Sequence, residues 1–148
     1  MKSNFPIILI VLGLLLNSCS DLELKLLNNV QSDYEIVVRP DANDNVNKSA
    51  KIVQSYLKKI SGVQLNIVDE SAQSSDKAKI YVGNMTGEEL DRHQVRISSS
   101  NGDLYISGGS DTALNNAVYE FLERYLGCKW YAPNVEKIPK LSLITLDL

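Results

Sequence analysis

Two runs of alternating apolar and polar residues, 94–98 and 103–107, lie on either side of the dipeptide Asn101-Gly102. Asn and Gly tolerate the positive φ angles that a tight turn between antiparallel strands requires. The pattern therefore predicts a β-hairpin with Asn101-Gly102 at its tip. This is the strongest short-range signal in the chain, and any fold proposed for the chain must contain it.

A helix is expected directly after this hairpin. The turn 108–111 leads into the helix, and Gly127 is expected to end it. The apolar residues between these two points recur at helical spacing: Leu114, Ala117, Val118, Phe121, Leu122 and Tyr125.

Strand and helix patterns also alternate along the rest of the chain. The β-rich run 34–39, stopped by Pro40, predicts a strand, and a helix is expected at 46–60 with Gly62 at its end. Further strands are expected at 64–68, 79–83, 128–131 and 141–148. Because each helix follows a strand, this order indicates an α+β fold, a mixed β-sheet with two helices packed on one face.

The N-terminus predicts export. Lys2 precedes an apolar run, 5–16, which has the length of a secretory signal core and is too short to span a bilayer. The sequence 16–19, Leu-Asn-Ser-Cys, then resembles the lipobox of bacterial lipoproteins, in which the cysteine is acylated and becomes the new N-terminus. We therefore expect a signal peptide at 1–18 and a lipid on Cys19. The alternative is an ordinary signal peptide with a chance cysteine.

Under this interpretation the exported part has two segments. Residues 19–32 are expected to be a polar tether, and residues 33–148 a single domain held on a bacterial membrane, at the outer membrane or the cell surface. With Cys19 acylated, Cys128 has no partner for an intramolecular disulfide, since the chain has 2 cysteines. The apolar core must then hold the fold without a disulfide.

Charge and glycine spacing argue against nucleic acid and nucleotides as partners. The formal net charge is −3, whereas nucleic-acid-binding domains cluster Lys and Arg on one face. Gly108-Gly109 lies between a strand and a helix, but its spacing matches neither the dinucleotide fingerprint nor the P-loop. We expect the two glycines to serve the turn itself, and we expect no cofactor.

No pattern in the chain predicts catalysis. His93 is the sole histidine and is expected in a polar loop. A zinc site needs three or four suitable ligands, and the sequence does not offer such a set around His93. Cys128 is expected in the core, and the adjacent carboxylate pairs are expected on the surface: Asp69-Glu70 and Glu88-Glu89. We therefore expect no catalytic residue and no metal site.

Trp130-Tyr131 is the candidate binding feature. Sugar rings present apolar C–H faces that stack on aromatic side chains, so an exposed Trp-Tyr pair at a domain edge suits carbohydrate. The alternative is that both rings seal the end of the second helix or contact another domain.

The segments 106–109 and 117–133 together resemble an accessory domain that precedes the catalytic barrel in several glycoside hydrolases. These are α-glucuronidases, β-N-acetylhexosaminidases and related large bacterial lipoproteins, and the resemblance extends from about Tyr34 to the C-terminus. It implies a mixed sheet with two helices on one side, and it puts the catalytic carboxylates in a following (β/α)₈ barrel. The chain departs from the family at Thr112-Ala113, where the family often has Arg-Gly.

Two functions follow from this resemblance. The first is a non-catalytic accessory domain of a carbohydrate-degrading system, truncated from a catalytic barrel or acting beside one. The second is a stand-alone surface lipoprotein that binds glycan or protein. The expected partners are the membrane, through the lipid, and a polysaccharide or a catalytic glycoside hydrolase domain. The chain is not expected to be catalytic alone.

Overall fold

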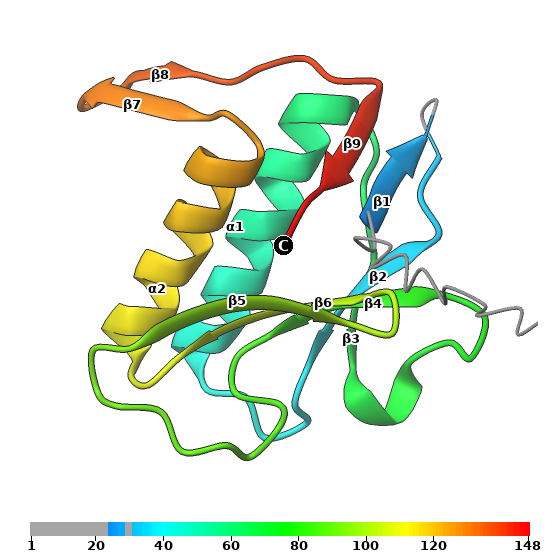
Figure 1. Ribbon diagram of the computed structural model, residues 1–148, viewed down its shortest axis with the longest axis vertical. Helices are drawn as coiled ribbons and strands as arrows, with labels where there is room; N and C mark the ends of the chain where they lie inside the picture. The colour runs from blue at the N-terminus through cyan, green and yellow to red at the C-terminus, as the bar shows by residue number, and fades with distance from the viewer. Residues whose placement is uncertain (1–23, 29–30) are drawn as a thin grey trace, which may run out of the picture.

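The computed structural model describes residues 24–28 and 31–148. Its main element is a five-stranded mixed sheet with the strand order β3-β2-β4-β6-β5 (Figure 1). Neighbouring strands from β3 to β6 are parallel, and β5 is antiparallel to β6. The strands are β2 (Tyr34–Val38), β3 (Ile67–Asp69), β4 (Ala78–Val82), β5 (Val95–Ser100) and β6 (Asp103–Gly108).

The hairpin predicted around Asn101-Gly102 is confirmed. It joins β5 to β6, with Ser100 opposite Asp103. Asn101 and Gly102 have φ angles of 53° and 87°. Positive φ at both central residues is the condition for the tight turn that continues the twist of the strands. Tyr34 on β2 also holds the tip, because its hydroxyl donates to the Gly102 carbonyl at 2.7 Å.

Two helices cover one face of this sheet, as the sequence predicts (Figure 1). Helix α1 (Asp44–Ser61) begins where the Asn43 side chain accepts from the Val46 amide, and it ends at Gly62, whose φ is 83°. Helix α2 (Asp111–Glu120) is capped by the Ser110 hydroxyl and continues as a π-helical segment, Phe121–Tyr125. The α+β class with both helices on one face is therefore confirmed.

The core lies between the sheet and the helices. Alternate residues of each strand face this layer, as strand geometry requires. Ile36, Ile80 and Ile106 come from three adjacent strands, and each is 0% exposed. They pack in one cluster with helix residues that include Val53, Leu57, Ala117, Val118 and Phe121.

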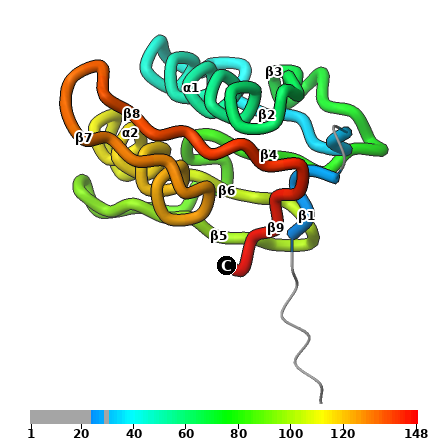
Figure 2. Tube along the Cα trace, turned by 90° about the horizontal axis from the view of Figure 1, so that it is seen from above, coloured from blue at the N-terminus to red at the C-terminus, as the bar shows by residue number. Residues whose placement is uncertain are grey.

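The segment expected as a tether, 19–32, contains a strand. Strand β1 (Leu24–Asn28) pairs antiparallel with β9 (Leu143–Leu146) in a separate two-stranded sheet, and the chain's C-terminal end lies beside it (Figure 2). Leu24, Leu26 and Leu27 are buried there, so apolar packing overrides the polar character of the segment. The signal peptide at 1–18 and Cys19 lie outside the described residues.

A second small hairpin extends beyond the helices. Strand β7 (Lys129–Ala132) lies where a strand is predicted, and it pairs antiparallel with β8 (Val135–Lys137), which the sequence did not predict. The turn between them contains Asn134, whose φ is 64°. A short 3₁₀ turn, Glu70–Ala72, follows β3. No helix within the described part of the chain is long and apolar enough to cross a membrane.

Candidate functional site

The structure places Trp130 among aromatic rings from both helices. The indole ring is half-buried and meets Tyr56 of α1 edge-on, with ring centroids 5.7 Å apart and planes inclined by 66°. Tyr119 of α2 meets it from another side at 5.1 Å and 81°. Edge-to-face contacts of this kind are favourable for aromatic pairs. The β7–β8 hairpin is therefore held against the helices by its tryptophan.

A chain of hydrogen bonds fixes these rings. The Trp130 Nε1 donates to the Tyr56 hydroxyl at 3.1 Å, and that hydroxyl donates to Glu136 Oε2 at 2.6 Å. Lys59 Nζ donates to Glu136 Oε1 at 3.1 Å and lies 4.6 Å from the centroid of the Tyr56 ring. The hydrogen bond from Tyr56, followed by that from Lys59, lowers the pKa of Glu136 below its ordinary value. Glu136 is thus a carboxylate at neutral pH.

Desolvation, followed by the hydrogen bond to Glu136, raises the pKa of the Tyr56 hydroxyl. Tyr56 therefore keeps its proton at neutral pH and donates it to the ionised Glu136. Both groups stay in the protonation state that the hydrogen bond needs, so we expect the ring arrangement to persist through the neutral range.

The rings line an open cleft of about 410 Å³, which we call the aromatic cleft. Its walls are Tyr56, Tyr119, Trp130, Ala132, Asn134, Val135 and Glu136. An indole, a carboxylate and a carboxamide together offer a stacking surface, an acceptor and a donor. This is the combination that a sugar ring with several hydroxyl groups requires.

Tyr131 does not line the aromatic cleft. Tyr131 is 68% exposed, and it lies at an irregularity of the β7–β8 pairing, where Trp130 is opposite Glu136 and Ala132 is opposite Val135. The structure thus separates the two candidates of the Trp-Tyr pair: Trp130 faces the helices and the cleft, whereas Tyr131 faces solvent. Val135 on β8 is also exposed, at 52%.

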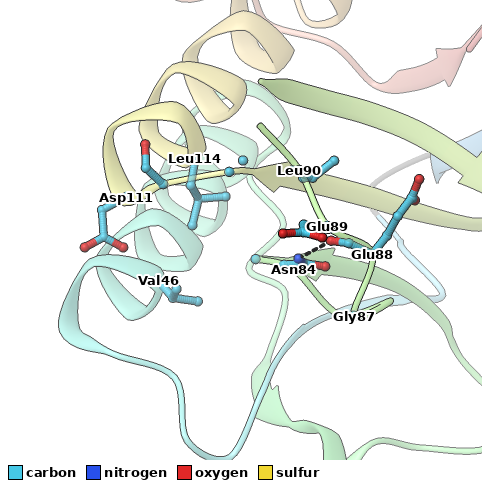
Figure 3. Close-up of a pocket in the computed structure, with 12 residues that line it drawn as sticks. Val46, Asn84, Gly87, Glu88, Glu89, Leu90, Asp111 and Leu114 are labelled. Atoms are coloured by element: carbon cyan, nitrogen blue, oxygen red, sulfur yellow. Dashed lines mark hydrogen bonds between the residues drawn. The ribbon is translucent and has the colours of Figure 1, made fainter. Parts of the chain in front are cut away.

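A larger recess, of about 570 Å³, lies where β4 and β6 end and α2 begins. Val46 of α1 and Leu114 of α2 line its apolar part, and Glu89 points into it from the connection between β4 and β5 (Figure 3). The Asn84 side chain donates to the Glu88 carbonyl at 2.7 Å and holds this connection in place.

Gly108 and Gly109 in the wall of this recess have structural roles. A Cβ atom on Gly108 would lie 2.1 Å from the Leu114 nitrogen, and one on Gly109 would lie 1.9 Å from the Asp91 carbonyl oxygen. Both distances are far shorter than van der Waals contact. Any residue with a Cβ atom would therefore collide with the neighbouring backbone, and the turn requires glycine at both positions. This agrees with the expectation that the Gly-Gly pair serves the turn.

The residues with catalytic potential are dispersed. His93 is exposed, whereas Cys128 is 0% exposed, and burial raises the pKa of its thiol. A buried thiol that keeps its proton is a poor nucleophile. Within residues 24–28 and 31–148, no group of three or more His, Cys, Asp and Glu side chains is arranged to hold a metal ion.

No protein-family model matches the chain, and no curated protein matches it. Among solved structures, the chain is similar to a GH138 enzyme targeting pectin rhamnogalacturonan II, with 14% sequence identity and a TM-score of 0.46. The similarity covers 62% of this chain and 10% of that chain, so the chain spans about a tenth of the enzyme's length.

The sequence predicts Trp130 as a candidate contact and does not predict the residues that surround it. Tyr56, Tyr119 and Glu136 come from three separate elements, and the Trp130–Tyr56 hydrogen bond joins residues 74 positions apart. Tyr56 and Tyr119 each lie beside the apolar stripe of a helix. This place at the edge of an apolar stripe is the sequence signal that could have drawn attention to the two tyrosines.

Proposed function

We propose that this chain is a non-catalytic accessory domain of a carbohydrate-degrading system, which binds glycan in the aromatic cleft and works beside a glycoside hydrolase barrel. The observation that carries the proposal is the cleft itself, in which three aromatic rings and a carboxylate line one open cavity. The sequence resemblance to the accessory domains of glycoside hydrolases supports the same class of function.

The geometry suits binding because the cleft is formed before a ligand arrives. The hydrogen bonds among Trp130, Tyr56 and Glu136 already fix the rings. Binding then costs little side-chain entropy, which is the general advantage of a preorganised site. A sugar would stack its C–H face on the Trp130 ring and donate hydroxyl protons to Glu136.

Glu136 also favours binding over hydrolysis. A glycosidase needs a second carboxyl group near the scissile bond, one that remains protonated to act as an acid. The pKa of Glu136 is lowered, chiefly by its hydrogen bond from Tyr56. Glu136 is also the one carboxylate among the residues that line the aromatic cleft.

Affinity electrophoresis tests this proposal, with xylan, pectin or a β-glucan cast into native gels. We expect at least one polysaccharide to retard the chain, and we expect Trp130→Ala and Tyr119→Ala to abolish the retardation. Tyr131→Ala is the matched control and should leave it unchanged. Trp130 is the sole tryptophan, so its emission reports directly on the cleft. Retardation that survives Trp130→Ala would contradict glycan binding in the cleft.

A second candidate is docking of a protein partner, and the exposed side of the β7–β8 hairpin favours it. Tyr131 is 68% exposed on that hairpin, and Val135, which also lines the aromatic cleft, is 52% exposed. Aromatic residues are enriched in protein interfaces. Under this proposal, Tyr131→Ala rather than Trp130→Ala would weaken co-purification with a catalytic domain encoded next to the gene.

We also propose that the domain is exported and anchored by a lipid on Cys19. The apolar run 5–16 and the lipobox-like sequence 16–19 support this. Growth of expressing cells with a clickable fatty acid should label the chain. Cys19→Ala should lose the label, and Cys128→Ala is the matched control that should keep it. Label retained in Cys19→Ala would refute the anchor.

A further inference from the structure

The face of the sheet that points away from the helices carries a second recess, of about 190 Å³. Figure 1 shows the connection between β4 and β5 running along this side of the sheet. The recess lies between that connection and the strands β5 and β6, and we call it the sheet recess. The strands supply Arg96, Ser98, Ser100, Tyr105 and Ser107, and the connection supplies Asn84, Thr86, Glu88 and Leu90.

Strand register brings the polar side chains of the sheet recess together. Ser98 is directly opposite Tyr105, and Arg96 is directly opposite Ser107. Opposite residues on one face of an antiparallel pair lie within contact distance of each other. The Tyr105 ring stacks on Tyr81 of β4, with centroids 4.9 Å apart and planes inclined by 21°. Its position in the wall is thereby fixed.

An ion pair closes one side of the sheet recess. Arg96 on β5 pairs with Glu88 on the connection, and the Glu88 backbone accepts from the Asn84 side chain at 2.7 Å. The two charges cancel, so the lining has no net charge to select an ionic ligand. In the described part of the chain, no protein group hydrogen-bonds to the hydroxyl of Ser98 or of Ser100. Ser107 donates to the Gly83 carbonyl at 3.0 Å and can still accept.

These groups match the chemistry of one neutral sugar ring. The serine hydroxyls can donate and accept, the tyrosine ring offers an apolar surface, and the Arg–Glu pair can bind vicinal hydroxyls from two sides. Sites for drug-sized ligands have volumes of about 300–1,000 Å³, so this smaller recess suits a single ring rather than a chain of rings.

We propose that the sheet recess binds a single neutral pyranose unit, as a second glycan contact of the domain. The choice of ligand class rests on the proposed function. Figure 1 shows the β7–β8 hairpin and the β4–β5 connection at opposite ends of the molecule. A branched or folded glycan could thus be held at two separate points, and the second contact would raise the overall affinity through effective concentration.

Amide chemical shifts of the isotope-labelled full chain test the proposal, in dodecylphosphocholine because sugar-based detergents would compete. The probes are the methyl pyranosides of glucose, galactose, mannose, xylose and rhamnose, with methyl glucuronate as the charged comparison. We expect at least one neutral glycoside to shift the amides of 84–90 and 96–107, and to do so more strongly than the glucuronate. No shift in these segments with any neutral glycoside would overturn the proposal.

Variants locate the effect. Ser98→Leu fills the sheet recess and should weaken the binding about tenfold or more, since it removes a hydrogen bond and blocks the space. Ser55→Leu, on the exposed surface of α1, is the matched control and should have no effect. If Ser98→Leu fails to fold by circular dichroism, Arg96→Gln replaces it and should weaken binding by removing the ion pair. Full binding in a folded variant would overturn the proposal.

The two glycan contacts fail separately. Retardation by a polysaccharide that depends on Trp130, without shifts at 84–107, overturns the sheet recess and leaves the aromatic cleft standing. Shifts at 84–107 without any dependence of retardation on Trp130 overturn the cleft and support the recess.

Discussion

The two faces of the main sheet are built from the same strands but from different chemistry. On the face toward the helices, Ile36, Ile80 and Ile106 are fully buried among apolar side chains. On the other face, Glu35, Lys79 and Tyr105 occupy the alternate positions of the same strands. Burial on the first face requires only apolar volume. On the second face the buried charged groups need specific partners, and Ser74 in the loop after β3 supplies hydrogen bonds to both Glu35 and Lys79.

The Glu35–Lys79 pair shows how the second face is held. Glu35 and Lys79 are 2% and 6% exposed, and their charged atoms lie 3.4 Å apart. Glu35 accepts from the Ser74 amide at 2.6 Å, and Lys79 donates to the Ser74 carbonyl at 2.6 Å. The loop after β3 is thus attached to the sheet by one ion pair and its hydrogen bonds. We therefore expect many apolar residues to share the stabilisation of the helical face, whereas on the other face we expect a few polar residues to provide most of it.

The largest effect should come from breaking this ion pair. Lys79→Met leaves the Glu35 carboxylate buried without a cation, which should lower the free energy of unfolding by about 3–5 kcal/mol. Urea denaturation of the folded domain measures the loss. The double variant Glu35→Leu with Lys79→Met should recover most of it, because no unpaired charge remains. A loss as large in the double variant as in the single one would show that packing, not charge, holds this loop.

On the helical face, Ile106→Ala should lower the free energy of unfolding by about 2–5 kcal/mol, because it leaves a cavity in a fully buried site. Ile106→Val is the matched control and should cost about 0.5–1.5 kcal/mol. Equal losses in both variants, measured by urea denaturation, would mean that this face tolerates voids and is not close-packed.

The stacked pair Tyr81–Tyr105 tests whether the second face has packing energy of its own. A double-mutant cycle with Tyr81→Ala and Tyr105→Ala should give a coupling of about 0.5–1.5 kcal/mol beyond the two separate losses. The measurement is again the free energy of unfolding, for each single variant and the double. Strictly additive losses would show that the stack contributes no stability.

The smallest effect is expected at Ser98. Ser98→Ala should change the free energy of unfolding by no more than about 0.5 kcal/mol, since no protein group in the described chain bonds to this hydroxyl. Thermal denaturation of the variant and the parent chain gives the difference. A loss well above that value would assign Ser98 a structural role and would weaken the case for recognition on this face.

Local patterns predicted most of the sheet and helices. The hairpin at Asn101-Gly102 and the end of α1 at Gly62 follow from residues that favour positive φ, and both are confirmed. Helix α1 begins at Asp44 rather than 46, because the Asn43 side chain caps it and admits two further residues. Signals of this kind act within a few residues, so a sequence displays them directly.

Elements that depend on contacts between residues far apart in the sequence could not be predicted from local patterns. Strand β1 is stable because it pairs with β9, and a bulge between Lys25 and Leu27 interrupts its alternation. Strand β8 has three residues and exists through its pairing with β7. The aromatic cleft has the same cause, since Tyr56 and Tyr119 meet Trp130 through the packing of the helices. Sequence order contains no record of such contacts.

The pairing of β1 with β9 has a mechanical consequence. The strands are antiparallel, with Leu24 opposite Leu146. The first residue of β1 and the last residue of β9 therefore lie side by side at one end of the two-stranded sheet. A force that draws Leu24 and Leu146 apart acts on one end of the ladder and breaks its hydrogen bonds one after another. Such unzipping requires less force than shearing all the bonds at once. We expect the two-stranded sheet to open under tension first, with the five-stranded sheet and its two faces still intact.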